Sequence, residues 1–282
     1  MKNTSAITIF LIVISLSSCA THESNEKNNE EKKAEIYYGQ GTNELVKKNY
    51  SQALINLLHA KELDPNDSQI RNNLGMAYYF RDQPELAEKE LLKAIDLDKN
   101  NSDARVNLGS LYLEKKRMKE ARSQYEIVLK DLTFQNQFRN YYNLAVLELE
   151  VGDRAKAFEY LFKSIKEKDE YCQAHFKLGE LYSEDNKYKQ ALISFQESGK
   201  GTCVNEPAPY YQQALSLVNL DRFEEAKLKL NEIIKKFPNN RFSSLATLQL
   251  KKISSNLKEQ KTVKSYQTEV INESKTIESP NF

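Results

Sequence analysis

The sequence predicts an all-α fold, a right-handed superhelical solenoid of six helical hairpins closed by a C-terminal capping helix. Three observations support this prediction: a repeat of about 34 residues, two small residues at a constant separation in each repeat, and few residues that break helices. The chain has 282 residues, of which eight are glycine and six are proline, and 29% of its residues are charged. This composition is typical of a helix-rich soluble protein.

The repeat is marked by alanines that recur every 34 to 36 residues: Ala53, Ala87, Ala121, Ala157, Ala191 and Ala226. Twelve residues before each alanine stands a second small residue: Gly41, Gly75, Gly109, Ala145, Gly179 and Ala214. Four residues after each alanine stands a large apolar residue: Leu57, Leu91, Tyr125, Leu161, Phe195 and Leu230. Small residues let two helices approach closely, and the i, i+4 spacing puts the alanine and the large residue on one helix face. Each repeat is therefore predicted to form a helical hairpin.

This pattern resembles the tetratricopeptide repeat, and it covers about residues 34 to 240. The six predicted repeats are 34–67, 68–101, 102–135, 138–171, 172–205 and 207–240, with short insertions at 136–137 and 206. Residues 241–258 keep apolar residues at helical spacing, so we expect a capping helix that ends the solenoid with a polar outer face. Residues 259–282 are polar, and we expect them to be disordered.

The N-terminus has the pattern of an export signal. A charged start at Lys2 precedes an apolar run at 6–16, which is too short to span a membrane. The following Leu16-Ser17-Ser18-Cys19 resembles the lipobox of bacterial lipoproteins, which implies removal of residues 1–18 and lipidation of Cys19. The alternative is an ordinary signal peptide with a cysteine near its cleavage site. We expect residues 19–33, polar and charged, to form a disordered tether.

The membrane is expected to be the bacterial outer membrane, with Cys19 inserting its lipid into the bilayer and the repeats facing the periplasm. This expectation follows from resemblance to lipoprotein sorting, in which Ala20 rather than Asp after the lipidated cysteine allows transfer to the outer membrane.

Charge and residue content exclude several classes of function. Lys and Arg total 41 and Asp and Glu total 40, without a basic run, so we expect no nucleic acid as a partner. The three histidines are His22 in the tether, His59 beside a core alanine, and His175 at a core position of its repeat. The sequence has no nucleophile motif, phosphate-binding glycine loop or metal-spaced Cys/His cluster. We therefore expect no enzymatic activity, cofactor, metal or small-molecule substrate.

The cysteines Cys172 and Cys203 lie at the two ends of the fifth predicted hairpin. These ends meet in an antiparallel hairpin, and an exported chain reaches an oxidising compartment in many bacteria, so a disulfide is predicted. The alternative is two free thiols, because the bond requires the two Cα atoms to come within about 7 Å.

The resemblance to tetratricopeptide solenoids implies that the first helices of successive repeats line a concave groove. The groove residues expected here are Tyr38, Leu45, Asn72, Met76, Tyr79, Val106, Ser110, Leu113, Tyr142, Val146, Leu149 and Phe176. Most are apolar or aromatic, and they lack the Lys, Asn and Arg set with which some such domains clamp acidic C-termini. An amphipathic helix or an extended apolar peptide of a partner protein is therefore the expected ligand. The alternative is that these residues are buried against neighbouring helices.

A closer resemblance is to the type IV pilus biogenesis lipoproteins called PilF, PilW and Tgl. The junction of the third and fourth repeats, Val128 to Phe134 followed by Tyr142-Asn143-Leu144, is similar to the lengthened linker of that family, although the proline usual there is missing. Phe158 to Leu161 and Lys235 to Pro238 also match. Family members are pilotins, so the resemblance implies binding of secretin subunits and promotion of their targeting and multimerisation. The alternative is an adaptor for another envelope machine, such as outer-membrane protein insertion or peptidoglycan synthesis.

Overall fold

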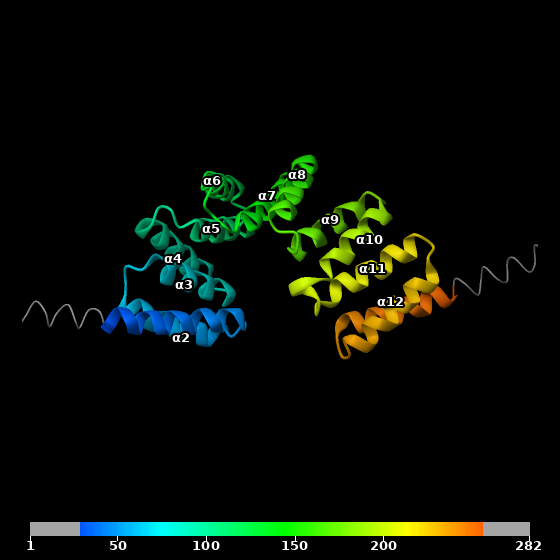
Figure 1. Cartoon of the computed structure of the whole chain (residues 1–282), viewed down its shortest axis with the longest axis horizontal. Coiled ribbons are helices and arrows are strands. Elements are labelled where there is room, and N and C mark those ends of the chain that lie inside the picture. The colour runs from blue at the N-terminus through cyan, green and yellow to red at the C-terminus, as the bar shows by residue number, and fades with distance from the viewer. Residues whose placement is uncertain (1–28, 256–282) are drawn as a thin grey trace, which may run out of the picture. The chain divides into compact units, whose positions relative to one another are not determined.

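The computed structural model describes residues 29–255, which form helices joined by short turns, without a strand in that range (Figure 1). The first helix covers residues 29–46 and the last covers residues 241–255. Between them lie α2 (Tyr50–Leu63), α3 (Ser68–Phe80), α4 (Pro84–Leu97), α5 (Ser102–Glu114), α6 (Met118–Val128), α7 (Gln137–Val151), α8 (Arg154–Glu167), α9 (Cys172–Glu184), α10 (Tyr188–Ser198), the short 3₁₀ helix η1 (Gly201–Cys203), α11 (Pro207–Asn219) and α12 (Phe223–Lys236). The predicted all-α tetratricopeptide fold is confirmed.

The helices pack in two compact units, which divide between Asp153 and Arg154. In unit 1 each of α2 to α6 packs on the next helix along the chain, and α5 also contacts α3 and α7. In unit 2 the same order links α8 through α12. The last helix joins the core of unit 2 through Ala246 and Ile253, which pack with Ala226, Leu230 and Ile233.

Helix boundaries follow from local chemistry. The Asp67 carboxylate accepts hydrogen bonds from the backbone N–H groups of Gln69 and Ile70 and so caps α3. Prolines at the first positions of α4 and α11 start those helices where a backbone N–H is not needed. The turn between the two helices of each hairpin contains one residue with a left-handed backbone: Lys48, Asp82, Lys116, Gly152, Asn186 and Asp221.

The small residues of the repeat lie where the two helices of a hairpin touch. A Cβ atom added at Gly75 would stand 2.7 Å from Cγ of Leu91, and one added at Gly179 would stand 2.6 Å from the ring of Phe195. Both large side chains are almost completely buried. The predicted close approach of paired helices at these columns is therefore confirmed, and it explains why glycine stands there.

Several segments differ from expectation or lie outside the described residues. Residues 29–33, assigned to the tether, are helical and continue into the first helix, because the Glu and Lys side chains there favour helix. Helix α6 ends at Val128, which corresponds to Ala94 one repeat earlier, whereas α4 continues to Leu97. The signal segment 1–18, Cys19 and the tail 259–282 lie outside the described residues. Within residues 29–255, no helix has the length and apolar character needed to span a bilayer.

Candidate functional site

The first helices of the hairpins in unit 1 are joined to one another by side-chain hydrogen bonds. The Asn73 amide donates to Oγ1 of Thr42 on the first helix (2.9 Å), and the Asn143 amide of α7 donates to Oγ of Ser110 on α5 (2.9 Å). The Asn107 amide of α5 donates to Oδ1 of Asn72 on α3 (2.8 Å). These bonds hold the helix at 29–46, α3, α5 and α7 side by side, so their solvent-facing side chains form one surface.

We call this surface the A-helix face of unit 1 and define it by the predicted groove residues that remain half-buried. They are Tyr38, Leu45, Met76, Tyr79, Ser110, Leu113, Tyr142, Val146 and Leu149. A half-buried side chain packs on its own helices with one side and offers the other side to a partner. Eight of these nine side chains are apolar or aromatic, which is the chemistry that commonly dominates protein interfaces.

Two predicted groove residues are not available to a ligand. Asn72 is 4% exposed and Val106 is 0% exposed, so both belong to the interior of unit 1. The side-chain amide of Asn72 accepts from Asn107 of the next repeat and donates to Asn73. Phe176 belongs to unit 2, where its ring packs edge-to-face on Phe195 at 5.4 Å. The predicted single groove is therefore wrong for Asn72 and Val106.

Tyr79 has the most perturbed environment on this face. Burial and a hydrogen bond to the Glu114 carboxylate raise the pKa of its phenol to about 12. The phenol is therefore protonated at neutral pH and donates to that carboxylate. Nearby, Ser110 accepts from the Asn143 amide and contacts the buried Tyr125 hydroxyl at 3.3 Å. These bonds fix the side chains at the centre of the face.

A row of polar side chains on the same face was not predicted from the sequence. Asn73, Asn107 and Asn143 occupy the sixth position of three consecutive repeats, and this recurrence, at spacings of 34 and 36 residues, is the signal that could have identified them. Arg139 extends the row by donating to Asp103 and to Asn107, each at 3.2 Å. Polar side chains that bond to one another therefore lie beside the apolar side chains of the face.

The two cysteines of unit 2 lie together. A disulfide joins Cys172, the first residue of α9, to Cys203 in η1, with Cα atoms 6.2 Å apart. The same segment is held from its other side by Lys236, whose ammonium donates to the Val204 carbonyl (2.9 Å) and to the Tyr210 hydroxyl (2.7 Å). The connection between α10 and α11 is therefore fastened at two points.

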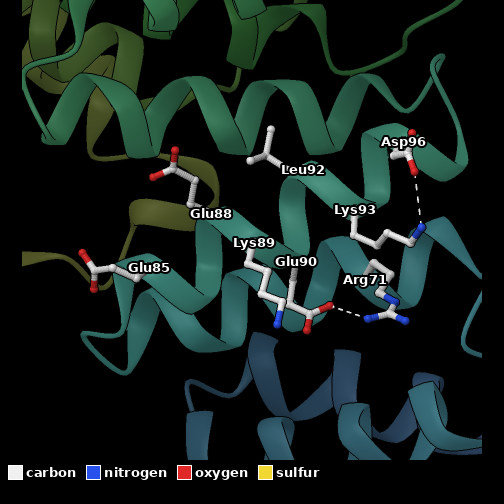
Figure 2. A pocket seen from close by; sticks show the side chains of 8 residues that line it. All are labelled: Arg71, Glu85, Glu88, Lys89, Glu90, Leu92, Lys93 and Asp96. Carbon is white, nitrogen blue, oxygen red and sulfur yellow. Dashed lines mark hydrogen bonds and ion pairs between the residues drawn. The ribbon is translucent and has the colours of Figure 1, made fainter.

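A hollow of about 730 Å³ on α3 and α4 is lined mainly by charged side chains, most of which form ion pairs (Figure 2). Arg71 donates to Glu90 (2.8 Å), and Lys93 pairs with Asp96 (3.3 Å). Glu88 pairs with Arg117 (2.7 Å), which lowers the pKa of the Glu88 carboxyl. These groups stabilise the hairpins rather than converge on a common point. Among residues 29–255, no cluster of His, Cys, Asp and Glu has the arrangement that would hold a metal ion.

Comparison with known families agrees with the repeat pattern and the fold. Two tetratricopeptide-repeat models match the chain, over residues 72–133 and 210–240. The chain contains tetratricopeptide repeats. These matches fall in both units, and each lies within the segments that form helical hairpins here.

Among known proteins, this tetratricopeptide-repeat protein is similar to the type IV pilus assembly protein PilF of Pseudomonas aeruginosa. The two are 26% identical over 192 residues, which are 66% of this chain and 75% of PilF. The solved structure of P. aeruginosa PilF has a TM-score of 0.63 at 20% identity, and the match covers 78% of this chain and 99% of the solved chain. The structure of PilW, a type IV pilus biogenesis factor, has a TM-score of 0.64 at 15% identity, covering 76% and 98%. The two structures share the fold of this chain.

Proposed function

We propose that this protein is a non-enzymatic outer-membrane lipoprotein of type IV pilus biogenesis that acts as a pilotin. It binds secretin subunits on the A-helix face of unit 1 and promotes their targeting and assembly into multimers. The observation that carries the proposal is the sequence similarity to PilF, which extends over three quarters of that protein. The half-buried apolar side chains of the face supply a surface suited to a protein segment.

The test replaces two aromatic side chains of that face, Tyr79→Ala with Tyr142→Ala. Buried aromatic anchors at interfaces are commonly worth about 2 kcal/mol or more each, so two hot spots predict a loss of secretin binding of roughly two to three orders of magnitude. The readout is the amount of heat-resistant secretin multimer relative to total secretin. Circular dichroism melts of the same variant verify that it stays folded.

A matched control replaces two exposed side chains of α4 in the same unit, Leu86→Ala with Leu92→Ala. This control should leave multimer yield unchanged. A folded Tyr79/Tyr142 variant with normal multimers would remove the A-helix face from the proposal. Normal multimers after deletion of the whole gene would contradict the pilotin role itself and favour an adaptor for another envelope machine.

The lipid anchor is tested separately through Cys19. Replacement Cys19→Ser removes the thiol that the lipobox resemblance assigns to lipidation, so the precursor should stay unprocessed or leave the outer-membrane fraction. Processing and fractionation identical to the unaltered protein would contradict the anchor and leave the secretin-binding test intact.

A further inference from the structure

The linker after α6 borders a second hollow of unit 1, of about 630 Å³, that the A-helix face does not include. The turn between α4 and α5 forms one wall, and the end of α6 with residues 129–133 forms the other. Its lining includes three cationic side chains, one carboxylate and two apolar side chains: Lys99, Arg105, Lys130, Asp131, Ile127 and Leu132. Lys99 is already paired with Asp96 (3.1 Å), so Arg105 and Lys130 are the cations open to a ligand. Cavities of this volume are in the range that binds ligands.

The linker holds an apolar side chain outward on an ordered turn. Leu132 is 94% exposed. The preceding Asp131 carboxylate accepts from the hydroxyls of Ser102 and Thr133, both at 2.7 Å, and the Gln137 amide donates to the carbonyls of Val128 (2.7 Å) and Asp131 (3.1 Å). A turn fixed by these bonds loses little conformational freedom on binding, so Leu132 is a preorganised contact.

The guanidinium of Arg105 lacks the carboxylate that neutralises its counterpart one repeat earlier. Arg71 donates to the backbone carbonyl of Pro65 and pairs with Glu90. Arg105 donates in the same way to the carbonyl of Lys99, but its other partner is the neutral side-chain amide of Gln124. Burial lowers the pKa of Arg105, but a guanidinium stays charged in the neutral range. The positive charge of Arg105 is therefore not neutralised by a direct ion pair.

Three other residues of the hollow differ in character from their counterparts one repeat earlier, and Asp131 stands where that repeat has Leu97. Thirty-four residues earlier, Ile127 corresponds to Lys93, Lys130 to Asp96 and Leu132 to Asp98. At the first three positions the earlier repeat therefore has the Lys93–Asp96 ion pair and Asp98, where this one has two apolar side chains and one lysine that is unpaired among the described residues. The chain thus contains, in one unit, a neutralised version of this surface and a version with unused positive charge and exposed apolar groups.

We propose that this hollow is a second protein-binding site, which takes a peptide segment with a bulky apolar side chain flanked by carboxylates. The apolar side chain would lie against Ile127 and Leu132, and the carboxylates would face Arg105 and Lys130. Charge complementarity selects an acidic ligand, and the exposed aliphatic groups select a peptide over a simple anion. The site goes beyond the proposed function, because none of its residues belongs to the A-helix face.

The experiment titrates the isotope-labelled, full-length processed protein with three heptapeptides: Gly-Asp-Leu-Glu-Phe-Asp-Gly, its Asn/Gln counterpart without carboxylates, and its Ser counterpart without apolar side chains. The acidic apolar peptide should shift the backbone amide signals of residues 99–105 and 127–133 in a saturable way. The two counterparts should bind at least tenfold more weakly. Equal binding of all three peptides, or no saturable shift with the acidic apolar one, overturns the proposal.

The matched variant installs the residues of the earlier repeat: Ile127→Lys, Lys130→Asp and Leu132→Asp. All three side chains are exposed, so the fold should survive, and a melting curve verifies this. Affinity for the acidic apolar peptide should fall at least tenfold, whereas Tyr79→Ala should leave it unchanged. If Tyr79→Ala weakened peptide binding and the triple variant did not, the peptide would bind the A-helix face and the proposed second site would be wrong.

A separate arm uses vesicles of phosphatidylglycerol and phosphatidylethanolamine, because lipid headgroups are also anionic. The proposal expects vesicle binding to be the same for the protein and its triple variant. The peptide assignment would be wrong if the unaltered protein bound vesicles but not the peptide, and if the triple variant lost the vesicle binding. The hollow would then be a site for lipid headgroups.

Discussion

At the residue scale, the turn inside each hairpin requires one residue with a positive φ. Glycine meets this requirement only at Gly152 (φ 87°), whereas Lys48 (φ 62°) and Asn186 (φ 58°) adopt the same left-handed region with a side chain. The left-handed conformation costs an L-residue roughly 1 to 2 kcal/mol, and Asn tolerates it better than Lys. The sequence does not reveal this position, because five of its six residues are not glycine.

Replacing the exposed Lys48 by Gly should raise the free energy of unfolding by about 0.5 to 1 kcal/mol, because relief of the left-handed strain exceeds the entropy that glycine adds to the unfolded chain. Gly152→Ala should lower it by about 1 kcal/mol for the converse reason. Asn186→Gly is the control and should change little. Urea titrations measure all three, and a destabilised Lys48→Gly variant would contradict the strain argument.

The phenol of Tyr79 should make stability fall at alkaline pH. Its pKa is raised from 10.0 to about 12, so the folded protein holds this proton more tightly than the unfolded chain does. The resulting stability is complete below pH 10 and is lost as pH rises toward 12. Tyr79→Phe removes this proton and should flatten the decline over that interval, as measured by urea titrations at stepped pH. An unchanged slope in Tyr79→Phe would show that other tyrosines carry the effect.

At the element scale, the sequence predicts the paired helices because their contact depends on residue size within one repeat. Gly109 and Tyr125 illustrate this dependence: a Cβ added at Gly109 would overlap the ring of Tyr125. The early end of α6 was not predictable in the same way. It depends on two hydrogen bonds: the Ser102 hydroxyl of α5 donates to the Asp131 carboxylate, and the Gln137 amide donates to the Val128 carbonyl. Local helix propensity does not encode such bonds.

Gly109→Ala should therefore lower the free energy of unfolding by about 1 to 3 kcal/mol through overpacking, less any gain from the better helix propensity of alanine. The same substitution in a Tyr125→Leu background should cost little. The fourth and sixth repeats already combine alanine with leucine at the equivalent positions, as Ala145 with Leu161 and Ala214 with Leu230. A double-mutant cycle from chemical denaturation measures the coupling. Equal losses in both backgrounds would place the clash elsewhere.

At the scale of the whole molecule, the repeat number and the all-α class follow from periodicity alone, whereas ligand access does not. Asn72 and Val106 occupy repeat positions expected to face a ligand, yet both are buried. Burial at those positions depends on how two repeats pack, and a pattern read within one repeat does not contain that information. The same limit explains why the bonds of Asn107 and Asn143 across helices were missed.

The disulfide of unit 2 should be a major source of its stability. The bond between Cys172 and Cys203 closes a loop with a sequence separation of 31, for which loop-closure entropy predicts about 3 to 4 kcal/mol. Reduction, or the double change Cys172→Ser and Cys203→Ser, should lower the free energy of unfolding by that amount. Mass spectrometry of non-reduced peptides should find the two cysteines linked in protein from the cell envelope. Two fully alkylated thiols in that sample would contradict the bond.

The hydrogen bonds that join the first helices of unit 1 also determine how that face can recognise anything. Spreading the face would break the bond between Asn73 and Thr42, the bond between Asn107 and Asn72, or the bond between Asn143 and Ser110. The face is therefore a stiff template, and adaptation falls to the partner. A flexible partner segment must order itself on the template, so association should be slow relative to diffusion and should have an unfavourable entropy. Affinity among partner sequences will then depend mainly on how readily each one adopts the bound shape.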